Sequence, residues 1–197
     1  SVCLAAIAPQ EAATGTRRGR ARGTAMPTST PQTPMSSARL LSLLHFADSA
    51  FPTGGYAHSF GLEALCQSGA VADAAGVERF LTSLLEGSAG PCDATAAASA
   101  LRALARGDLA ACRRLDDTLE AMKSVREFRE GSRQMGRQTL RVAAALTADP
   151  TLGGYRAEVD AGRAPGHHSV AFGMAAAILG WEPEETAAAF LYSTTSL

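Results

Sequence analysis

Apolar residues recur at helical spacing along almost the whole chain from Arg39 onward, and this periodicity sets the fold class. Between residues 77 and 85 they fall at the i, i+3, i+4 and i+7 positions that form one face of an α-helix. No segment alternates apolar and polar residues as a half-buried strand does, and no Asn-Gly hairpin or internal repeat is present. The sequence therefore predicts an all-α protein, a compact single-domain bundle of roughly eight to ten helices.

Turn and cap residues divide this pattern into separate helices. Asp73 and Asp108 each stand directly before an apolar-periodic run, where an N-cap residue is expected. A long helix is predicted from about residue 124 to residue 148, because Asp149-Pro150 would end it. A break is expected at Gly90-Pro91, and loops are expected at Gly153-Gly154 and from Gly162 to Gly166.

The first 37 residues differ in composition from the rest. They contain an arginine-rich run from Arg17 to Gly23, followed by a stretch rich in Thr, Ser and Pro, and Glu11 is their only acid. They show no hydrophobic period, so we expect disorder, either in an upstream extension or in an organelle transit peptide. The domain assignment is therefore an N-terminal extension over residues 1–37 and one helical domain over residues 38–197.

Bulk properties exclude several classes of function. Hydrophobic residues make up 46% of the 197 residues and charged residues 19%, which is a soluble globular composition. The formal net charge of -1 argues against bulk attraction to nucleic acid or to an anionic membrane. No apolar run reaches the ~18–20 residues that span a bilayer. The 4 cysteines are scattered and form no Cys-x-x-Cys pair, a pattern that favours the cytoplasm.

The long helix predicted near residue 124 carries a row of arginines. At about 100° per residue, five arginines fall within one stripe, which we call the arginine stripe: Arg126, Arg129, Arg133, Arg137 and Arg141. Phe128 and Met135 lie on the opposite side and are expected to be buried. Glu130 can pair with Arg126 and with Arg133 along the helix. The stripe is either a solvated charged face or a docking surface for an acidic partner.

Candidate residues for catalysis and metal binding are few. His167 and His168 are neighbours, and on a regular helix neighbours point about 100° apart, so they are weak candidates for one metal ion. No Gly-x-Ser-x-Gly motif surrounds a serine, and no phosphate-binding loop is present. The residues alone therefore predict neither an enzyme nor a nucleotide-binding protein.

Three stretches carry a resemblance to a known family. The first is the turn and helix start Pro52-Thr53-Gly54-Gly55-Tyr56-Ala57-His58-Ser59-Phe60-Gly61-Leu62-Glu63. The second is the arginine helix, and the third is Pro165-Gly166-His167-His168-Ser169-Val170-Ala171-Phe172-Gly173. In this order and spacing they resemble the urease accessory protein family UreF, from about Leu40 to the end of the chain.

The resemblance implies an all-α protein without enzymatic activity of its own and without a stably bound cofactor. UreF-like proteins are expected to join the accessory protein UreD (called UreH in some species) and the GTPase UreG on the urease apoprotein. That assembly delivers nickel to the urease active site, so nickel is handled by the complex. The UreF-like component would bridge UreD and UreG and modulate the GTPase cycle, and it would form a homodimer.

Carried onto this sequence, the resemblance implies two groups of partner-binding residues. In the turn motif these are Gly54, Gly55, Tyr56, Ser59 and Glu63. Along the arginine helix they are Lys123, Arg126, Arg129, Arg133 and Arg137. Family members continue beyond Leu197 with another helix and a tail that engages UreD, and that segment is expected to be lacking here.

Two competing hypotheses follow from the residues. A metallochaperone would bind nickel itself through His167, His168 or a cysteine. A helical nucleic-acid-binding module would use the arginine stripe, but the net charge and the lack of interleaved aromatic residues argue against it.

Overall fold

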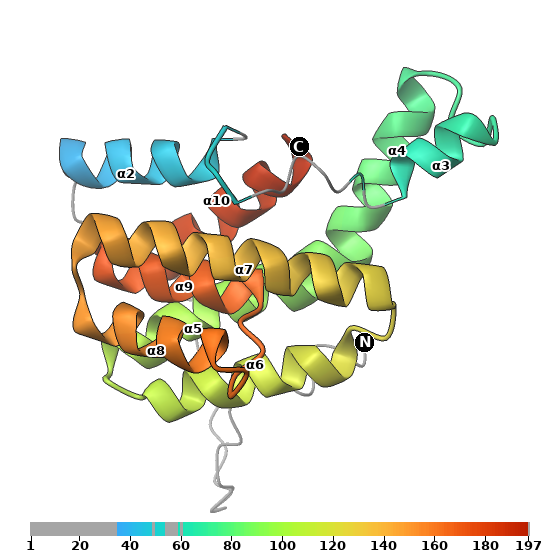
Figure 1. Ribbon diagram of the computed structural model, residues 1–197. Coiled ribbons are helices and arrows are strands. Elements are labelled where there is room, and N and C mark those ends of the chain that lie inside the picture. The colour runs from blue at the N-terminus through green and yellow to red at the C-terminus, as the bar shows by residue number, and fades with distance from the viewer. Residues whose placement is uncertain (1–34, 49, 54–58, 60, 197) are drawn as a thin grey trace, which may run out of the picture.

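The computed structural model describes residues 35–48, 50–53, 59 and 61–196. These residues form helices and connecting turns, and no strand occurs among them, so the predicted all-α class is confirmed. The helices pack around a central one, α9, which lies between α5 and α7 (Figure 1). In chain order they are α2 (Ser37–Ala47), α3 (Leu62–Gln67), α4 (Ala74–Leu84), the π-helix η2 (Leu85–Ala94), α5 (Thr95–Ala105), α6 (Leu109–Met122), α7 (Arg126–Thr147), α8 (Pro150–Asp160), α9 (His168–Ile178) and α10 (Pro183–Thr195).

Short polar side chains begin several of the helices, as the sequence predicts. The Asp73 carboxylate accepts a hydrogen bond from the Gly76 amide at 2.7 Å and caps α4. The Asp108 carboxylate does the same for α6, accepting from the Ala111 amide at 2.8 Å. Each cap satisfies a backbone donor that has no partner inside its helix.

The predicted break at Gly90-Pro91 is wrong. The chain remains helical there but widens into the π-helix η2, which carries Pro91 in its interior and joins α4 directly to α5. In a π-helix the carbonyl of residue i accepts from the amide of residue i+5, and here the Gly90 carbonyl accepts from the Thr95 amide. The same carbonyl also accepts from the Thr95 hydroxyl at 3.0 Å. These two bonds carry the helix past a proline that has no N–H to donate.

The predicted loop at Gly153-Gly154 is also wrong, because both glycines lie inside α8. α7 does end near the predicted position, where Ala148 adopts a left-handed backbone with φ of 52°. The Asp149 carboxylate then caps α8, accepting from the amides of Thr151 at 2.9 Å and Leu152 at 3.1 Å. Pro150 occupies the first turn of α8, where a missing N–H costs nothing.

The core is built on α9, which is buried from His168 to Ala176. Its small residues allow close packing: a Cβ on Gly173 would lie 2.9 Å from the Ala100 Cβ of α5. Trp181 follows α9, and its indole N–H donates to the Ser42 hydroxyl of α2 at 2.9 Å. α2 is further held by ion pairs from Arg39 to Glu185 and Glu182 at the start of α10.

α7 meets the segment before α9 at unusually short range. A Cβ on Gly136 would lie 2.7 Å from the carbonyl carbon of His167 and 2.8 Å from the amide nitrogen of His168, which real Cβ atoms essentially never do. Only glycine allows this approach. The predicted burial of the apolar side of α7 is confirmed for Met135, whereas Phe128 is 44% exposed near the helix start.

Among the described helices, none is both long and apolar enough to cross a membrane.

We predict that Gly136→Ala destabilises the protein by roughly 2–3 kcal/mol, because the added methyl group must push α7 away from the backbone of His167 and His168. Denaturant unfolding followed by circular dichroism measures the change. Gly153→Ala is the matched control, since a Cβ there meets nothing within 4 Å and alanine favours the helix by up to about 1 kcal/mol. Equal effects of the two substitutions would contradict the packing argument.

Candidate functional site

The arginine stripe lies along α7, but its members have different surroundings. Arg126, Arg137 and Arg141 are exposed, whereas Arg129 and Arg133 are partly buried and turn toward α6. Arg126 pairs with Glu130 one turn further along, with Nε 2.8 Å from Oε1. That guanidinium lowers the pKa of Glu130 below its ordinary value.

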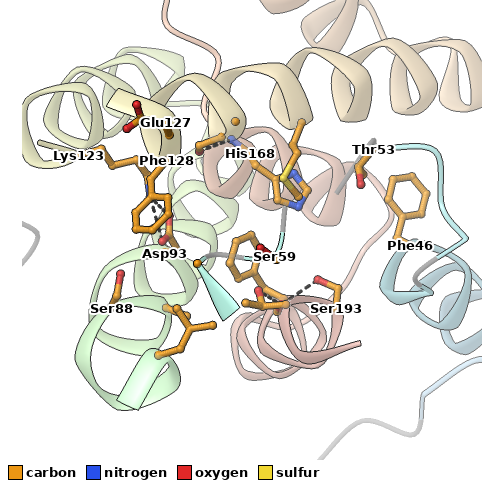
Figure 2. A pocket seen from close by; sticks show the side chains of 18 of the residues that line it. Phe46, Thr53, Ser59, Ser88, Asp93, Lys123, Glu127, Phe128, His168 and Ser193 are labelled. Atoms are coloured by element: carbon orange, nitrogen blue, oxygen red, sulfur yellow. Dashed lines mark hydrogen bonds and ion pairs between the residues drawn. The ribbon is translucent and has the colours of Figure 1, made fainter. Parts of the chain in front are cut away.

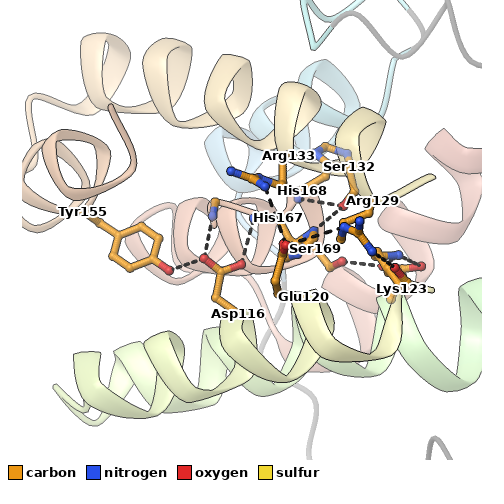
Figure 3. Close-up of polar contacts among 12 residues, drawn as sticks. Asp116, Glu120, Lys123, Arg129, Ser132, Arg133, Tyr155, His167, His168 and Ser169 are labelled. Atoms are coloured by element: carbon orange, nitrogen blue, oxygen red, sulfur yellow. Dashed lines mark hydrogen bonds and ion pairs between the residues drawn. The ribbon is translucent and has the colours of Figure 1, made fainter. Parts of the chain in front are cut away.

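Glu120 of α6 is the shared acceptor for the two inner arginines (Figure 3). Its Oε1 lies 3.5 Å from Arg129 Nε and 3.6 Å from Arg133 Nη1, and its Oε2 lies 3.0 Å from His167 Nε2. Arg129 also donates through Nη1 to the Lys123 carbonyl at 2.9 Å. Arg129 and Arg133 therefore tie α7 to α6, and part of their charge is neutralised within the chain.

His167 is fully buried and hydrogen-bonded at both ring nitrogens. A carboxylate only accepts, so Nε2 carries the proton and donates to Glu120. Nδ1 then accepts from the Ser132 hydroxyl at 3.1 Å, and that hydroxyl oxygen accepts from the His168 amide at 3.3 Å. Burial lowers the pKa of His167, which favours this neutral tautomer.

Asp116 of α6 is a fully buried carboxylate with three donors. It accepts from the Tyr155 hydroxyl at 2.6 Å, from the Gly166 amide at 2.7 Å and from the His167 amide at 2.8 Å. Burial raises the pKa of Asp116, although these hydrogen bonds act in the opposite direction. The carboxylate thereby fixes the backbone that leads into α9.

His168 has the opposite tautomer to His167. The Thr139 hydroxyl donates to the Met135 carbonyl at 2.9 Å, so it accepts from His168 Nδ1 at 3.1 Å. The imidazole packs against the rings of Phe172 and Phe190, with centroids 5.8 Å and 5.2 Å away. Burial lowers the pKa of His168 to about 4.

Lys123, predicted as a partner contact, is engaged inside the molecule. Its ammonium lies 2.9 Å from the Asp93 carboxylate of η2, and both side chains are largely buried. The Ser169 hydroxyl donates to the same carboxylate at 2.6 Å. This network joins η2, α9 and the segment between α6 and α7.

The predicted residues of the turn motif have different outcomes. Gly54, Gly55 and Tyr56 lie outside the residues that the structure describes. Ser59 and Glu63 are exposed, and the Glu63 carboxylate accepts from the Gln67 amide nitrogen at 3.3 Å. Their predicted role in partner binding remains a prediction.

A cavity of about 310 Å³ lies between α7, α10 and η2 (Figure 2). Its wall combines rings such as Phe46, Phe128 and Phe190 with polar groups such as Asp93 and His168. Thr53, Ser59 and Gly61 also line it, and they border residues that the structure does not describe. We therefore assign this cavity no ligand.

No cluster of three or more His, Cys, Asp or Glu side chains within the described part of the chain could hold a metal ion. Both ring nitrogens of His167 are used in hydrogen bonds, and Nδ1 of His168 donates to the Thr139 hydroxyl. The structure thus does not direct the two histidines toward a common ligand position.

Sequence reasoning missed Asp116 and Glu120, although one signal was present. In α6, Asp116 falls between Cys112 and Leu119 on the side that is otherwise apolar. An acid inside an apolar stripe indicates a buried, hydrogen-bonded group. The position of its donors, 39 to 51 residues away, could not be inferred from this pattern.

Comparison with known proteins decides the family. The family model of UreF matches residues 71–196. The urease accessory protein UreF of Paenarthrobacter aurescens (strain TC1) is 36% identical over 163 residues, which cover 82% of this chain and 70% of that protein. The chain belongs to the UreF family.

Other UreF proteins show a comparable match. That of Arthrobacter sp. (strain FB24) is 36% identical over 156 residues, covering 79% of this chain and 67% of the relative. That of Actinobacillus pleuropneumoniae serotype 3 (strain JL03) is 33% identical over 155 residues, covering 79% and 68%. The resemblance to UreF is confirmed, and it gives this chain a role in urease maturation as an accessory protein.

We predict that Asp116→Asn destabilises this UreF by roughly 2–4 kcal/mol. The substituted amide offers one acceptor oxygen and turns an N–H₂ group toward donors that need an acceptor. Equilibrium unfolding in urea measures the loss. The neighbouring Asp117→Asn is the control, because Asp117 is exposed and its replacement is expected to change little. A neutral Asp116→Asn would show that the carboxylate is not needed.

The second prediction from this site concerns pH. The folded-state pKa of His168, about 4, lies below its ordinary value of 6.5, so the unfolded chain binds more protons between these values and stability falls as the pH falls. From pH 7 to pH 5 this histidine should remove about 2 kcal/mol from the free energy of unfolding. The lowered pKa of His167 acts in the same sense as that of His168, and the raised pKa of Asp116 acts in the opposite sense.

The difference between wild type and His168→Asn isolates this contribution. Asparagine keeps an N–H near the position of Nδ1 but does not titrate. We expect the variant to be less stable at pH 7 and to show the shallower pH dependence. Parallel stability curves for the two proteins would refute the assignment to His168.

Proposed function

We propose that this chain bridges UreD (or UreH) and the GTPase UreG on the urease apoprotein and modulates GTP-dependent insertion of nickel. Membership of the UreF family supports a role in urease maturation. The more specific roles rest on the fold and on the surface that it presents.

The observation that carries the proposal is the way α7 is held. Its inner side is fixed by the close contact at Gly136 and by the ion pairs of Glu120 with Arg129 and Arg133. Its outer side exposes further arginines to solvent. A helix that is already ordered before a partner arrives loses little entropy on binding, which suits a scaffold.

Docking is the simplest contribution of this surface to the GTPase cycle. Arginine forms paired hydrogen bonds with carboxylates and is enriched in protein interfaces. An arginine that entered the GTPase site could also stabilise transition-state charge, but docking alone would couple UreF to UreG.

In this proposal nickel is handled by the complex and no cofactor is bound stably by the chain itself. The alternative, a metallochaperone that uses His167 and His168, finds no preorganised site among the described residues. We further propose that the protein works in the cytoplasm, forms a homodimer and engages neither nucleic acid nor membrane.

Bridging predicts a specific result in a pull-down. With a tag on UreD, UreG should be retained only when this chain is present, because the two would meet through it. Immunoblotting of the eluate for UreG measures retention, and omission of the chain is the control.

The same components, mixed with urease apoprotein, nickel and GTP, should restore urease activity only when the chain is included. Retention of UreG on UreD without the chain would contradict bridging. If the chain captures neither UreD nor UreG, the proposed function as a whole is contradicted.

A further inference from the structure

Acidic neighbours pair with the first three arginines of the arginine stripe and leave the last two unpaired within the described part of the chain. Arg129 and Arg133 share Glu120, and Arg126 pairs with Glu130. Arg137 and Arg141 are exposed, and they form no ion pair with any residue that the structure describes. The unneutralised charge of α7 is therefore concentrated in its second half.

Nothing along the helix can neutralise these two arginines. They stand four residues apart and are neighbours on the surface of α7. Their other neighbours three and four positions away on the same helix include no acid: Arg133, Gln134, Gln138, Leu140, Ala144 and Ala145. Like charges at this spacing disfavour the helix, so the pair does not serve the fold.

We infer that Arg137 and Arg141 form the docking point for an acidic surface of a protein partner, whereas Arg129 and Arg133 hold α7 to α6. This inference rests on the proposed function and assigns the surface to the GTPase UreG. The partner-binding residues predicted from the sequence on the arginine helix are thereby reduced to Arg137, because Lys123 and Arg126 also form ion pairs within the chain. Arg141 is added to it.

The surroundings favour a carboxylate-bearing protein over a nucleic acid. Arg137 and Arg141 are separated by about one helical turn, and the exposed residues Gln134 and Ala145 border them along the helix. Such a surface lets two carboxylates approach with paired hydrogen bonds. No aromatic residue stands beside them on the helix to stack a base.

The chain supplies a matched control for charge. Arg79 of α4 and Arg106 at the end of α5 are also exposed and without an ion pair among the described residues, but they stand on two different elements. Arg137→Glu/Arg141→Glu and Arg79→Glu/Arg106→Glu therefore change the net charge equally. They differ only in where the charge is reversed.

The test measures the affinity of the full chain for UreG at low and at moderate salt. We expect Arg137→Glu/Arg141→Glu to bind at least about tenfold more weakly and with a smaller salt dependence, because attraction to the partner's acids becomes repulsion. The Arg79→Glu/Arg106→Glu control should stay within about twofold of wild type. Circular dichroism and thermal unfolding verify that both variants remain folded.

A third variant separates docking from folding. Arg129→Gln/Arg133→Gln removes the pairs with Glu120, so it should lower the melting temperature while keeping the affinity for UreG within about twofold. A loss of affinity in this variant equal to that of Arg137→Glu/Arg141→Glu would overturn the division of the stripe.

Two further outcomes would overturn the inference. Wild-type affinity in Arg137→Glu/Arg141→Glu would place the docking point elsewhere, and equal weakening in the Arg79→Glu/Arg106→Glu control would show a nonspecific charge effect. In both cases wild-type binding to UreG would leave the proposed function standing. Absence of binding by the wild type at either salt concentration would remove the proposed function and this inference together.

Discussion

The buried carboxylate of Asp116 is the interaction on which the arrangement of α6, α7 and α9 depends. It accepts from the amides of Gly166 and His167 and thereby fixes the backbone that passes beneath Gly136 of α7. A buried acid is costly unless its lone pairs are satisfied, and the Tyr155 hydroxyl supplies a third donor. Once this segment is fixed, His167 reaches Glu120, and Glu120 positions the inner arginines of α7.

Features that depend on neighbouring residues could be predicted from the sequence. The caps at Asp73 and Asp108 and the end of the long helix near Asp149 follow from backbone groups within one turn. The stripe on α7 follows from helical periodicity alone. Such predictions succeed because their physical causes lie within a few residues of the pattern.

Features that depend on tertiary contact could not be predicted. Gly153 and Gly154 resemble a loop in sequence, but α8 is capped at Asp149 and anchored by buried Leu152 and Tyr155, which outweighs the poor helix propensity of glycine. The division of the arginine stripe depends on Glu120, which belongs to a different helix. Periodicity shows which residues share a face, and it does not show which of them another element will neutralise.

The π-helix η2 has a mechanical consequence. Because η2 replaces the expected break, α4, η2 and α5 follow one another as continuous helix with no loop between them. α4 buries only Gly76 and projects from the bundle, whereas α5 lies in the core (Figure 1). A displacement of α4 would therefore pass along a continuous helix to Asp93, and from its carboxylate to Lys123 and Ser169.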